Sequence, residues 1–565
     1  MTNKAYVGGP GTGKTSRIVE EIYETIVTET ETDVNYAYDI VIVTKTNSAK
    51  HVIKNRIFDY MTERGIAETD VRYILNNVRT IDSFSLDFFV DSTGLEREKI
   101  KKKIWEIIVA DSLKKGKRSE LIDLIKNVFG LEKINPDNLY YRSYYGSYFY
   151  EGEEVYLIST INFLDYILFK NGGLKYSYKD LEEFINRNIN FFKAYKLIRP
   201  NTNLLEEKGK LVNVIDTFIY LIEKGKLYTF NYIVFSAIKE AKEKIKYIFV
   251  DEANELSPLY ANFILNAGKN IVWGMDPMQT IYNFSGFSDL TYNSILDSKP
   301  QIIKLTTQYR IPANIYDRII KFVVSEINLI GTEHLKRFFG NMYDIVLDYF
   351  NKTKSVVSGG NIYVFDKKFT KFDVINFMKN FGYDAIILTR RISFKNFLKK
   401  HINNLTEYSF IFDSSYYDKL LNILHDLFIN NGKYSINEIK MYLKKSVYNE
   451  LVKNKVEYID SNYVKNIGLH KFVDNFLNVN ERIKTKLIEN LSKSETDSMA
   501  NRIYVSTIHN TKGGEFDNVI VINDFSVKTL DKFRRKYIDV YLYEIFVIYV
   551  GMTRSKNMLY VIFLI

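Results

Sequence analysis

The sequence of 565 residues contains no cysteine. This absence excludes disulfide bonds, thiolate metal sites, thiol redox chemistry and a cysteine nucleophile. The chain also has no long uncharged apolar run, because its most apolar late stretch, residues 537–552, contains Asp539 and Glu544. Such a stretch argues against a membrane span. No signal peptide precedes the strand-like segment that begins at Ala5. We therefore expect a soluble, cytoplasmic protein with no membrane partner.

Composition favours several folded domains. At about 150 residues per domain, the length predicts roughly four. Hydrophobic residues make up 46% and charged residues 26%, which excludes a disordered or collagen-like chain. Lysine and arginine number 78 against 68 acidic residues, a net charge of +10. This balance favours an anionic partner such as nucleic acid, although most charged residues form ordinary solvated surfaces.

Short apolar runs alternate with lysine-rich helical patterns. Several runs are continuous in isoleucine and valine, which is typical of buried parallel strands. The alternation therefore predicts α/β domains with parallel sheets. The runs fall into two groups: residues 5–7, 40–43, 247–250 and 271–273 in the first, and 302–305, 362–365, 385–388, 503–506, 519–522 and 559–563 in the second.

Two long segments interrupt the alternation and are rich in helix-forming residues. We interpret residues 91–230 and 401–500 as mainly helical insertions, one in each α/β domain. The predicted first domain then comprises residues 1–90 and 231–300, and the second comprises 301–400 and 501–565.

A phosphate-binding loop lies near the start of the chain. Its sequence, GGPGTGKT, fits G-x-x-x-x-G-K-[ST], follows an apolar strand and precedes a helical run. Backbone amides of such a loop surround phosphate oxygens, and the helix N-terminus favours negative charge. The lysine is expected at the β- and γ-phosphates and Thr15 at Mg²⁺. The predicted nucleotide contacts are Gly8, Gly9, Pro10, Gly11, Thr12, Gly13, Lys14, Thr15 and Ser16.

Further strand ends carry residues suited to phosphate chemistry. Asp251 follows the run 247–250 and can hold Mg²⁺, and Glu252 can orient and deprotonate an attacking water. Gln279 can hydrogen-bond the γ-phosphate or that water. Arg310 and Arg554 can stabilise transition-state charge, an effect of about 10³–10⁵ in rate. Taken singly, each arginine fits a surface ion pair better than a role at the phosphate.

Together, eight blocks in matching order resemble the UvrD/Rep-type helicases of superfamily 1. They include TKTNSA, TIDSF, DEANELS, DPMQTIYNFSG, TIHNTKGGEF and YVGMTRSK. The eight blocks are residues 8–15, 44–49, 80–84, 251–257, 276–286, 386–390, 507–516 and 549–556.

This resemblance implies a fold and a set of roles. It implies two RecA-like P-loop domains that hold ATP and Mg²⁺ between them, with Gln279, Arg310 and Arg554 sensing the γ-phosphate. Tyr309 would stack on the adenine and Glu515 would meet the ribose. The implied DNA contacts are Thr46, Asn47, Phe84, Tyr282, Phe284 and His509. Stacking of aromatic rings on bases contributes about 1–3 kcal/mol each.

Departures from the family pattern change some expectations. Lys45 stands where the family has an aromatic residue, which favours a DNA phosphate contact over stacking. Asp82 replaces a histidine, Asn254 replaces a glutamine and Met275 replaces a glycine. We therefore expect the coupling between nucleotide and DNA strand to differ from that of the family.

The sequence thus predicts an ATP-dependent helicase or translocase on single-stranded DNA and single-strand/duplex junctions. The resemblance implies 3′→5′ movement. We expect a monomer that can self-associate on DNA. Three alternatives stay open: a translocase that remodels protein–DNA complexes without processive unwinding, a nucleotide-gated nucleic-acid-binding protein, and RNA as the track.

Overall fold

The computed structural model describes most of the chain in two compact units. The described residues are 3–29, 39–114, 117–134, 154–194, 208–281, 287–379, 381, 384–402, 408–412, 420, 423–424, 426–428, 432–439, 442–479, 484–485, 487–488, 491 and 501–564. The first unit comprises Met1–Ile362, Lys512–Glu515 and Ser526–Met558, and the second comprises Tyr363–Thr511, Phe516–Phe525 and Leu559–Ile565. Residues 301–362 and 526–558 thus group with the first unit, whereas the sequence analysis assigned them to the second domain.

The first unit is built on a six-stranded sheet in the order β3-β2-β4-β5-β1-β6. Every neighbouring pair is parallel, as the isoleucine and valine runs predict. The carboxyl ends of the strands therefore meet at one edge, where polar residues collect. The strands are β1 (Lys4–Gly8), β2 (Ile40–Thr44), β3 (Val78–Thr80), β4 (Ile245–Val250), β5 (Gly268–Met275) and β6 (Gln301–Leu305).

Strand β6 corrects one prediction. The run 302–305 was grouped with the second sheet, but β6 pairs with β1 along its whole length. Between β5 and β6, the described residues form the short helices η2 (Pro277–Gln279) and α15 (Ser288–Asp297), and the chain then returns to the same sheet. An apolar run by itself does not specify which sheet it joins. As a result, the segment after β6 lies beside the loop after β1.

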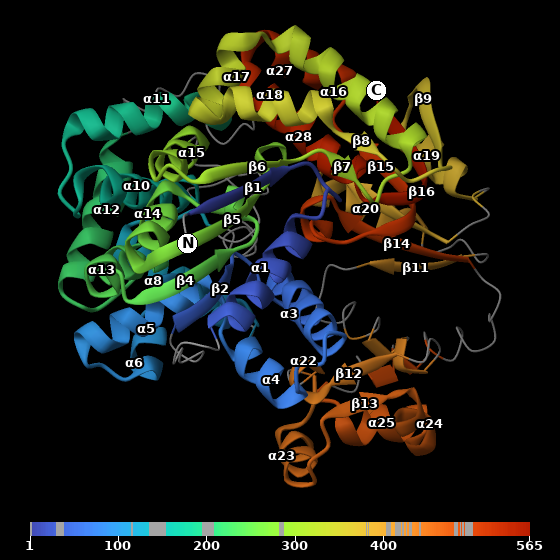
Figure 1. Ribbon diagram of the computed structural model, residues 1–565, viewed down its shortest axis with the longest axis horizontal. Helices are drawn as coiled ribbons and strands as arrows, with labels where there is room; N and C mark the ends of the chain where they lie inside the picture. Colours follow the sequence, from blue (N-terminus) through green and yellow to red (C-terminus); the bar gives the residue numbers. More distant parts are fainter. Residues whose placement is uncertain are drawn as a thin grey trace. The chain divides into compact units, whose positions relative to one another are not determined.

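Two layers of helices cover the first sheet (Figure 1). The first layer packs through isoleucines such as Ile18, Ile53 and Ile57 against Ile42 and Phe249. In the second layer, α5 contacts β2 and α14 contacts β5. The first layer is α1 (Lys14–Glu29), α3 (Asn47–Thr62) and α4 (Glu68–Asn76), and the second is α5 (Ile81–Thr93), α13 (Phe230–Ala241) and α14 (Pro258–Ala267).

The described residues of the first insertion are mainly helical, as predicted. Its aromatic core includes Trp105, Phe129 and Phe218, whose ring centroids are 4.6–5.5 Å apart. Its helices are α6 (Arg97–Lys101), α7 (Trp105–Lys114), α8 (Arg118–Phe129), α10 (Glu154–Asn171), α11 (Tyr178–Ala194) and α12 (Lys208–Glu223).

A third group of helices completes the first unit. They contact one another side by side in Figure 1, and α28 is buried from Val540 to Met552. This burial accounts for the apolar stretch at 537–552 as a core helix. Within the described part of the chain, no helix is both long and apolar enough to cross a membrane. The group comprises α16 (Ala313–Ile330), α17 (Thr332–Phe339), α18 (Tyr343–Lys352), α27 (Val527–Lys536) and α28 (Ile538–Met552).

The second unit contains another six-stranded sheet, in the order β11-β14-β10-β15-β16-β9. Strand β10 pairs in parallel with β14 and β15, and β11 pairs in parallel with β14. Helices α19 (Lys371–Lys379) and α20 (Ile392–Ile402) pack on it. Its strands are β9 (Asn361–Phe369), β10 (Ala385–Thr389), β11 (Tyr408–Phe412), β14 (Asn501–Thr507), β15 (Phe516–Asn523) and β16 (Ser555–Leu564).

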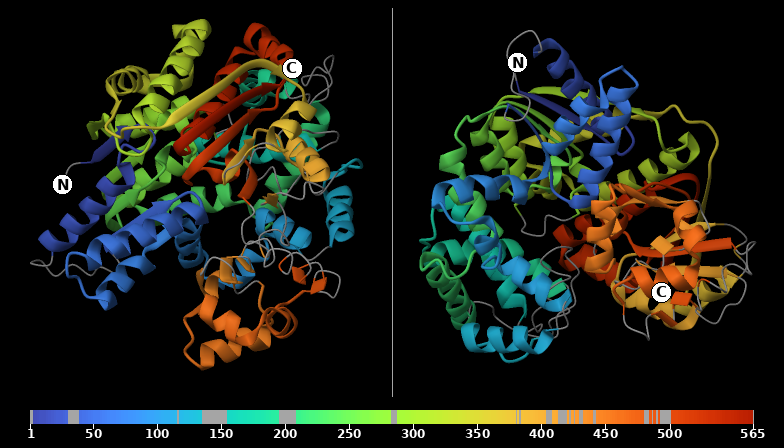
Figure 2. Two further views of the ribbon diagram at one scale, coloured as in Figure 1. Left: turned by 90° about the vertical axis from the view of Figure 1, so that its right-hand side faces the viewer. Right: turned by 90° about the horizontal axis from the view of Figure 1, so that it is seen from below.

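The second insertion has its own hydrophobic core, which includes Leu451, Val464 and Phe472. Figure 2 shows this cluster in orange, with short helices around a two-stranded antiparallel sheet. The described elements are β12 (Lys433–Ser435), α22 (Ile436–Ile439), α23 (Lys445–Lys453), β13 (Tyr458–Asp460), α24 (Ser461–Ile467) and α25 (Leu469–Phe476).

Candidate active site

The strand order of the first sheet explains how distant residues converge. The phosphate loop follows β1, which lies between β5 and β6, and β4 lies beyond β5. Asp276 and Gln279 therefore stand on one side of the loop, and Gln308 and Arg310 stand on the other. Asp251 and Glu252 follow β4, one strand farther along.

The phosphate loop depends on glycine at two positions. Gly11 and Gly13 have φ of 71° and 87°, a region that glycine enters without steric cost. A Cβ on Gly11 would stand 2.7 Å from Cβ of Arg310. The side chain of Thr12 fixes the turn by donating to the carbonyl of Gly9 at 2.8 Å. Pro10 is buried and Ser16 is exposed at the start of α1.

Lys14 lies inside the loop. Its Nζ donates to the carbonyls of Gly8 and Gly9 at 2.8 and 2.7 Å and lies 3.9 Å from Oδ2 of Asp276. Burial lowers the pKa of Lys14, while Asp276 and Glu252 oppose that shift. A buried ammonium held by neutral carbonyls is well suited to exchange them for phosphate oxygens, because charge-assisted hydrogen bonds are stronger.

Thr15 and Asp251 fit a magnesium site. The Thr15 hydroxyl donates to Oδ2 of Asp251 at 2.9 Å. Burial, together with the adjacent Glu252, raises the pKa of Asp251 to about 6. A divalent cation would offset this buried negative charge. Magnesium at phosphate sites commonly takes one or two protein oxygens plus phosphates and waters.

Glu252 has an unusual backbone and a basic neighbour. Its φ of 57° is left-handed, a conformation that is uncommon outside glycine and often found at functional sites. Its Oε2 lies 3.4 Å from Nζ of Lys512, which also pairs with Glu255 and donates to the carbonyl of Gln279 at 2.9 Å. Burial alone would raise the pKa of Glu252, but Lys512 and nearby cations lower it below its usual value. Glu252 is therefore held as a carboxylate.

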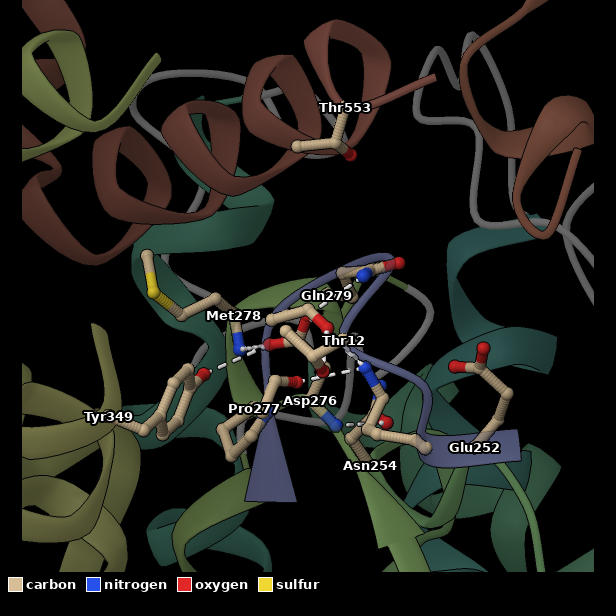
Figure 3. Close-up of polar contacts among 12 residues, drawn as sticks. Thr12, Glu252, Asn254, Asp276, Pro277, Met278, Gln279, Tyr349 and Thr553 are labelled. Carbon is tan, nitrogen blue, oxygen red and sulfur yellow. Dashed lines mark hydrogen bonds and ion pairs between the residues drawn. The ribbon is translucent and has the colours of Figure 1, made fainter. Parts of the chain in front are cut away.

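Asp276 directly follows β5 and forms hydrogen bonds with several neighbouring residues (Figure 3). Its carboxylate accepts from the amide of Met278, from Nε2 of Gln279 at 2.7 Å and from the hydroxyl of Tyr349 at 3.0 Å. Its own amide donates to Oδ1 of Asn254 at 3.0 Å. These contacts fix the short helix η2 (Pro277–Gln279) beside the phosphate loop.

Gln279 and Arg554 are joined within the first unit. Nη2 of Arg554 donates to Oε1 of Gln279 at 3.1 Å, and its Nε donates to the carbonyl of Val550 at 2.9 Å. Burial, with a further contribution from Arg310, lowers the pKa of Arg554 to about 10. Arg554 stays protonated at neutral pH, so it places a positive charge beside the glutamine.

The segment after β6 covers the other side of the loop. The amide of Tyr309 donates to the carbonyl of Gly11 at 2.9 Å, while its ring is 62% exposed. Oε1 of Gln308 accepts from the amides of Arg310 and Ile311. Arg310 forms an ion pair of 2.5 Å with Glu515, and burial lowers the pKa of Arg310. The block thus lies directly against the phosphate loop.

Comparison with known protein families agrees with this geometry. Residues 3–299 match the UvrD/REP helicase N-terminal domain, and residues 502–562 match the UvrD-like helicase C-terminal domain. The chain belongs to the UvrD/Rep helicase family. A search of curated individual proteins gives no significant match. As a member of this family, the chain is a helicase or translocase of the P-loop class, an enzyme class that uses ATP and acts on DNA.

The residues assigned to DNA contacts differ in their structural surroundings, and those contacts stay predictions. Thr46 caps α3 by accepting from the amide of Ala49, and Asn47 is exposed. Phe84 is 3% exposed and packs against Phe88 and Phe263 at 5.4 Å. Its ring is thus covered by other aromatic side chains, and its predicted contact with DNA stays a prediction.

Two other predicted DNA contacts, Tyr282 and Phe284, lie outside the described residues. His509 is 5% exposed in η4 (His509–Thr511), directly after β14. Its proposed contact with DNA stays a prediction.

Lys45 contacts an aromatic ring of its own chain. Its Nζ lies 3.9 Å from the ring centroid of Tyr260, beside a set of buried acids. Burial raises the pKa of Glu106, Asp165 and Glu255 to about 7, and the charge of Lys45 opposes that rise. The side chain of Lys45 is half-buried, and its predicted contact with a DNA phosphate stays a prediction.

Sequence reasoning missed several residues of the site. Lys512 and Glu255 lie inside the recognised UvrD/Rep blocks, but no chemistry was assigned to them. Their pairing joins positions 257 residues apart, which no local pattern reveals. Tyr349 lies outside every block, and nothing in the sequence points to its bond with Asp276.

Proposed function

We propose that this chain hydrolyses ATP at the phosphate loop of its first sheet and uses the energy to move 3′→5′ along single-stranded DNA, unwinding duplex ahead. The observation that carries the proposal is the gathering of Lys14, Asp251, Glu252 and Arg554 around one phosphate loop. Polarity and strand preference rest on family membership.

Binding would use the loop amides and Lys14. Phosphate oxygens would replace the carbonyls of Gly8 and Gly9 as acceptors for Lys14. Thr15 and Asp251 would hold Mg²⁺, which neutralises charge on the phosphate oxygens when bound. The exposed ring of Tyr309 would stack on the base.

Hydrolysis would use Glu252 as the base. A water oxygen attacks the γ-phosphorus, the bond from that phosphorus to the β–γ bridging oxygen breaks, and Glu252 takes the water proton. ADP and inorganic phosphate leave. Arg310 and Arg554 would stabilise charge on the transferring group. Lys512 supports this role because it keeps Glu252 ionised.

Movement would follow from chain connectivity. The segment Lys512–Glu515 lies between β14 and β15, and α27 and α28 lie between β15 and β16. Residues beside the phosphate loop are therefore covalently continuous with strands of the second sheet. A shift of Lys512 or Arg554 on hydrolysis would be passed to that sheet through the backbone.

The test compares unwinding of duplexes that carry a 3′ or a 5′ single-stranded tail, with Glu252→Gln as the inactive control. We expect ATP-dependent unwinding of the 3′-tailed duplex only. Unwinding of the 5′-tailed duplex would overturn the polarity.

Parallel assays separate the alternatives. Displacement of streptavidin from biotinylated DNA without unwinding would favour a remodelling translocase. Stimulation of phosphate release by RNA rather than DNA would indicate that the protein moves along RNA. Phosphate release that no nucleic acid stimulates would favour a nucleotide-gated binding protein.

A further inference from the structure

Tyr549 carries a buried hydroxyl without a hydrogen-bond partner in the described structure. Its side chain is 0% exposed and lies in the last turn of α28. A buried hydroxyl that makes no hydrogen bond costs free energy, and phenylalanine would fill the same space without that cost. A ligand that enters the site would remove the penalty.

The hydroxyl lies against the phosphate loop. It is 3.6 Å from the position that a Cβ on Gly9 would occupy. The carbonyl of Gly9 is one of the two that hold Nζ of Lys14. Arg554, five residues along the same chain, binds Gln279. Tyr549 therefore lies on the side of the loop where the groups proposed for the γ-phosphate gather.

A neighbouring tyrosine hydroxyl already forms a hydrogen bond within the protein. The hydroxyl of Tyr349 donates to Asp276 at 3.0 Å. Burial, reinforced by the charge of Asp276, raises the pKa of Tyr549 far above its usual value. Tyr549 therefore keeps its proton at neutral pH, so its hydroxyl is available as a neutral donor.

We propose that the hydroxyl of Tyr549 donates a hydrogen bond to the γ-phosphate of bound ATP, so that α28 contributes both a neutral donor and the cation of Arg554. This inference rests on the proposed function, because it needs ATP at the phosphate loop. The contact is made with ATP and is lost with ADP. Tyr549 would thus add discrimination between the two nucleotides.

The test uses Tyr549→Phe in the full chain and measures affinity for ADP and for a non-hydrolysable ATP analogue by fluorescence titration. We expect affinity for the analogue to fall about tenfold or more, because a hydrogen bond to a charged group is lost. Affinity for ADP stays unchanged. The thermal midpoint of the nucleotide-free protein stays the same or rises, since an unpartnered hydroxyl is removed.

Tyr541→Phe is the matched control. Tyr541 lies on the same helix, and its hydroxyl donates to Glu326, away from the loop. Its loss should leave both affinities unchanged.

The outcomes distinguish failure of the Tyr549 contact from failure of the proposed function. If Tyr549→Phe leaves affinity for the analogue unchanged while the wild type binds it, the inference is wrong and the proposed function stands. An equal loss for ADP and the analogue also overturns the γ-phosphate contact. If the wild type binds neither nucleotide, the proposed function itself fails.

Discussion

The loops that follow a central strand differ between the two sheets. After β1 of the first sheet, Gly11 and Gly13 adopt left-handed backbone and leave amides facing inward. After β10 of the second sheet, the amides of Arg390 and Arg391 both donate to Oδ1 of Asp524, at 3.0 and 3.1 Å. In the second sheet, the carboxylate of Asp524 thus accepts from amides after the strand. In the first sheet, we expect a bound phosphate to accept from the corresponding amides.

This difference indicates which of the two α/β sheets can bind a nucleotide phosphate. Amides at a helix N-terminus bind anions, and a protein carboxylate satisfies them as well as a phosphate does. Nε of Arg391 completes the contact by donating to Oδ2 of Asp524 at 2.8 Å. We therefore expect nucleotide binding in the first unit only, with variants of the two units giving different losses.

The largest expected effect is that of Lys14→Ala. Removal of the ammonium leaves the phosphates without their buried counter-charge, so steady-state phosphate release should fall at least about 10³-fold. Lys99→Ala, at an exposed ion pair with Glu96, is the control and should keep full activity. Unchanged hydrolysis by Lys14→Ala would exclude this loop as the active site.

Lys512→Ala should give a smaller loss and a changed pH profile. Lys512 lowers the pKa of Glu252, so its removal raises that pKa and leaves less of the base ionised. The acid limb of kcat should therefore move to higher pH, with a loss of roughly 10²-fold at neutral pH. Lys512→Arg should restore the limb. A uniform loss at every pH would indicate a merely structural role.

Asp524→Asn tests the second sheet. It weakens the charged bond to Arg391, and lost hydrogen bonds to charged groups cost about 1.5–3 kcal/mol. Amide hydrogen exchange should accelerate in β10 and β15, while affinity for ATP stays at the wild-type value. Loss of ATP binding with normal exchange would contradict the division between the sheets.

Glu106→Gln should have the smallest effect. Burial raises the pKa of Glu106 to about 7, so the folded state binds more protons than the unfolded state between about pH 4 and 7. Stability of the first unit is therefore lost as pH rises through that window. The variant should show a flatter dependence of its unfolding midpoint on pH. An unchanged slope would mean that Glu106 does not carry this proton.

Local signals could be predicted from the sequence. The strands, the phosphate loop and the pair Asp251–Glu252 depend on neighbours within a few residues. The sheet to which 302–305 belongs and the pairing of Lys512 with Glu255 depend on positions distant in the chain. Phe84 shows a further limit, because the sequence block does not reveal that its aromatic ring packs against Phe88 and Phe263.

The most direct test of the central claim is the number of ATP-binding sites per chain, measured by equilibrium titration with a non-hydrolysable analogue. We predict one site, abolished by Lys14→Ala and kept by Asp524→Asn. Two sites, or one that survives Lys14→Ala, would contradict the assignment of nucleotide binding to the first sheet.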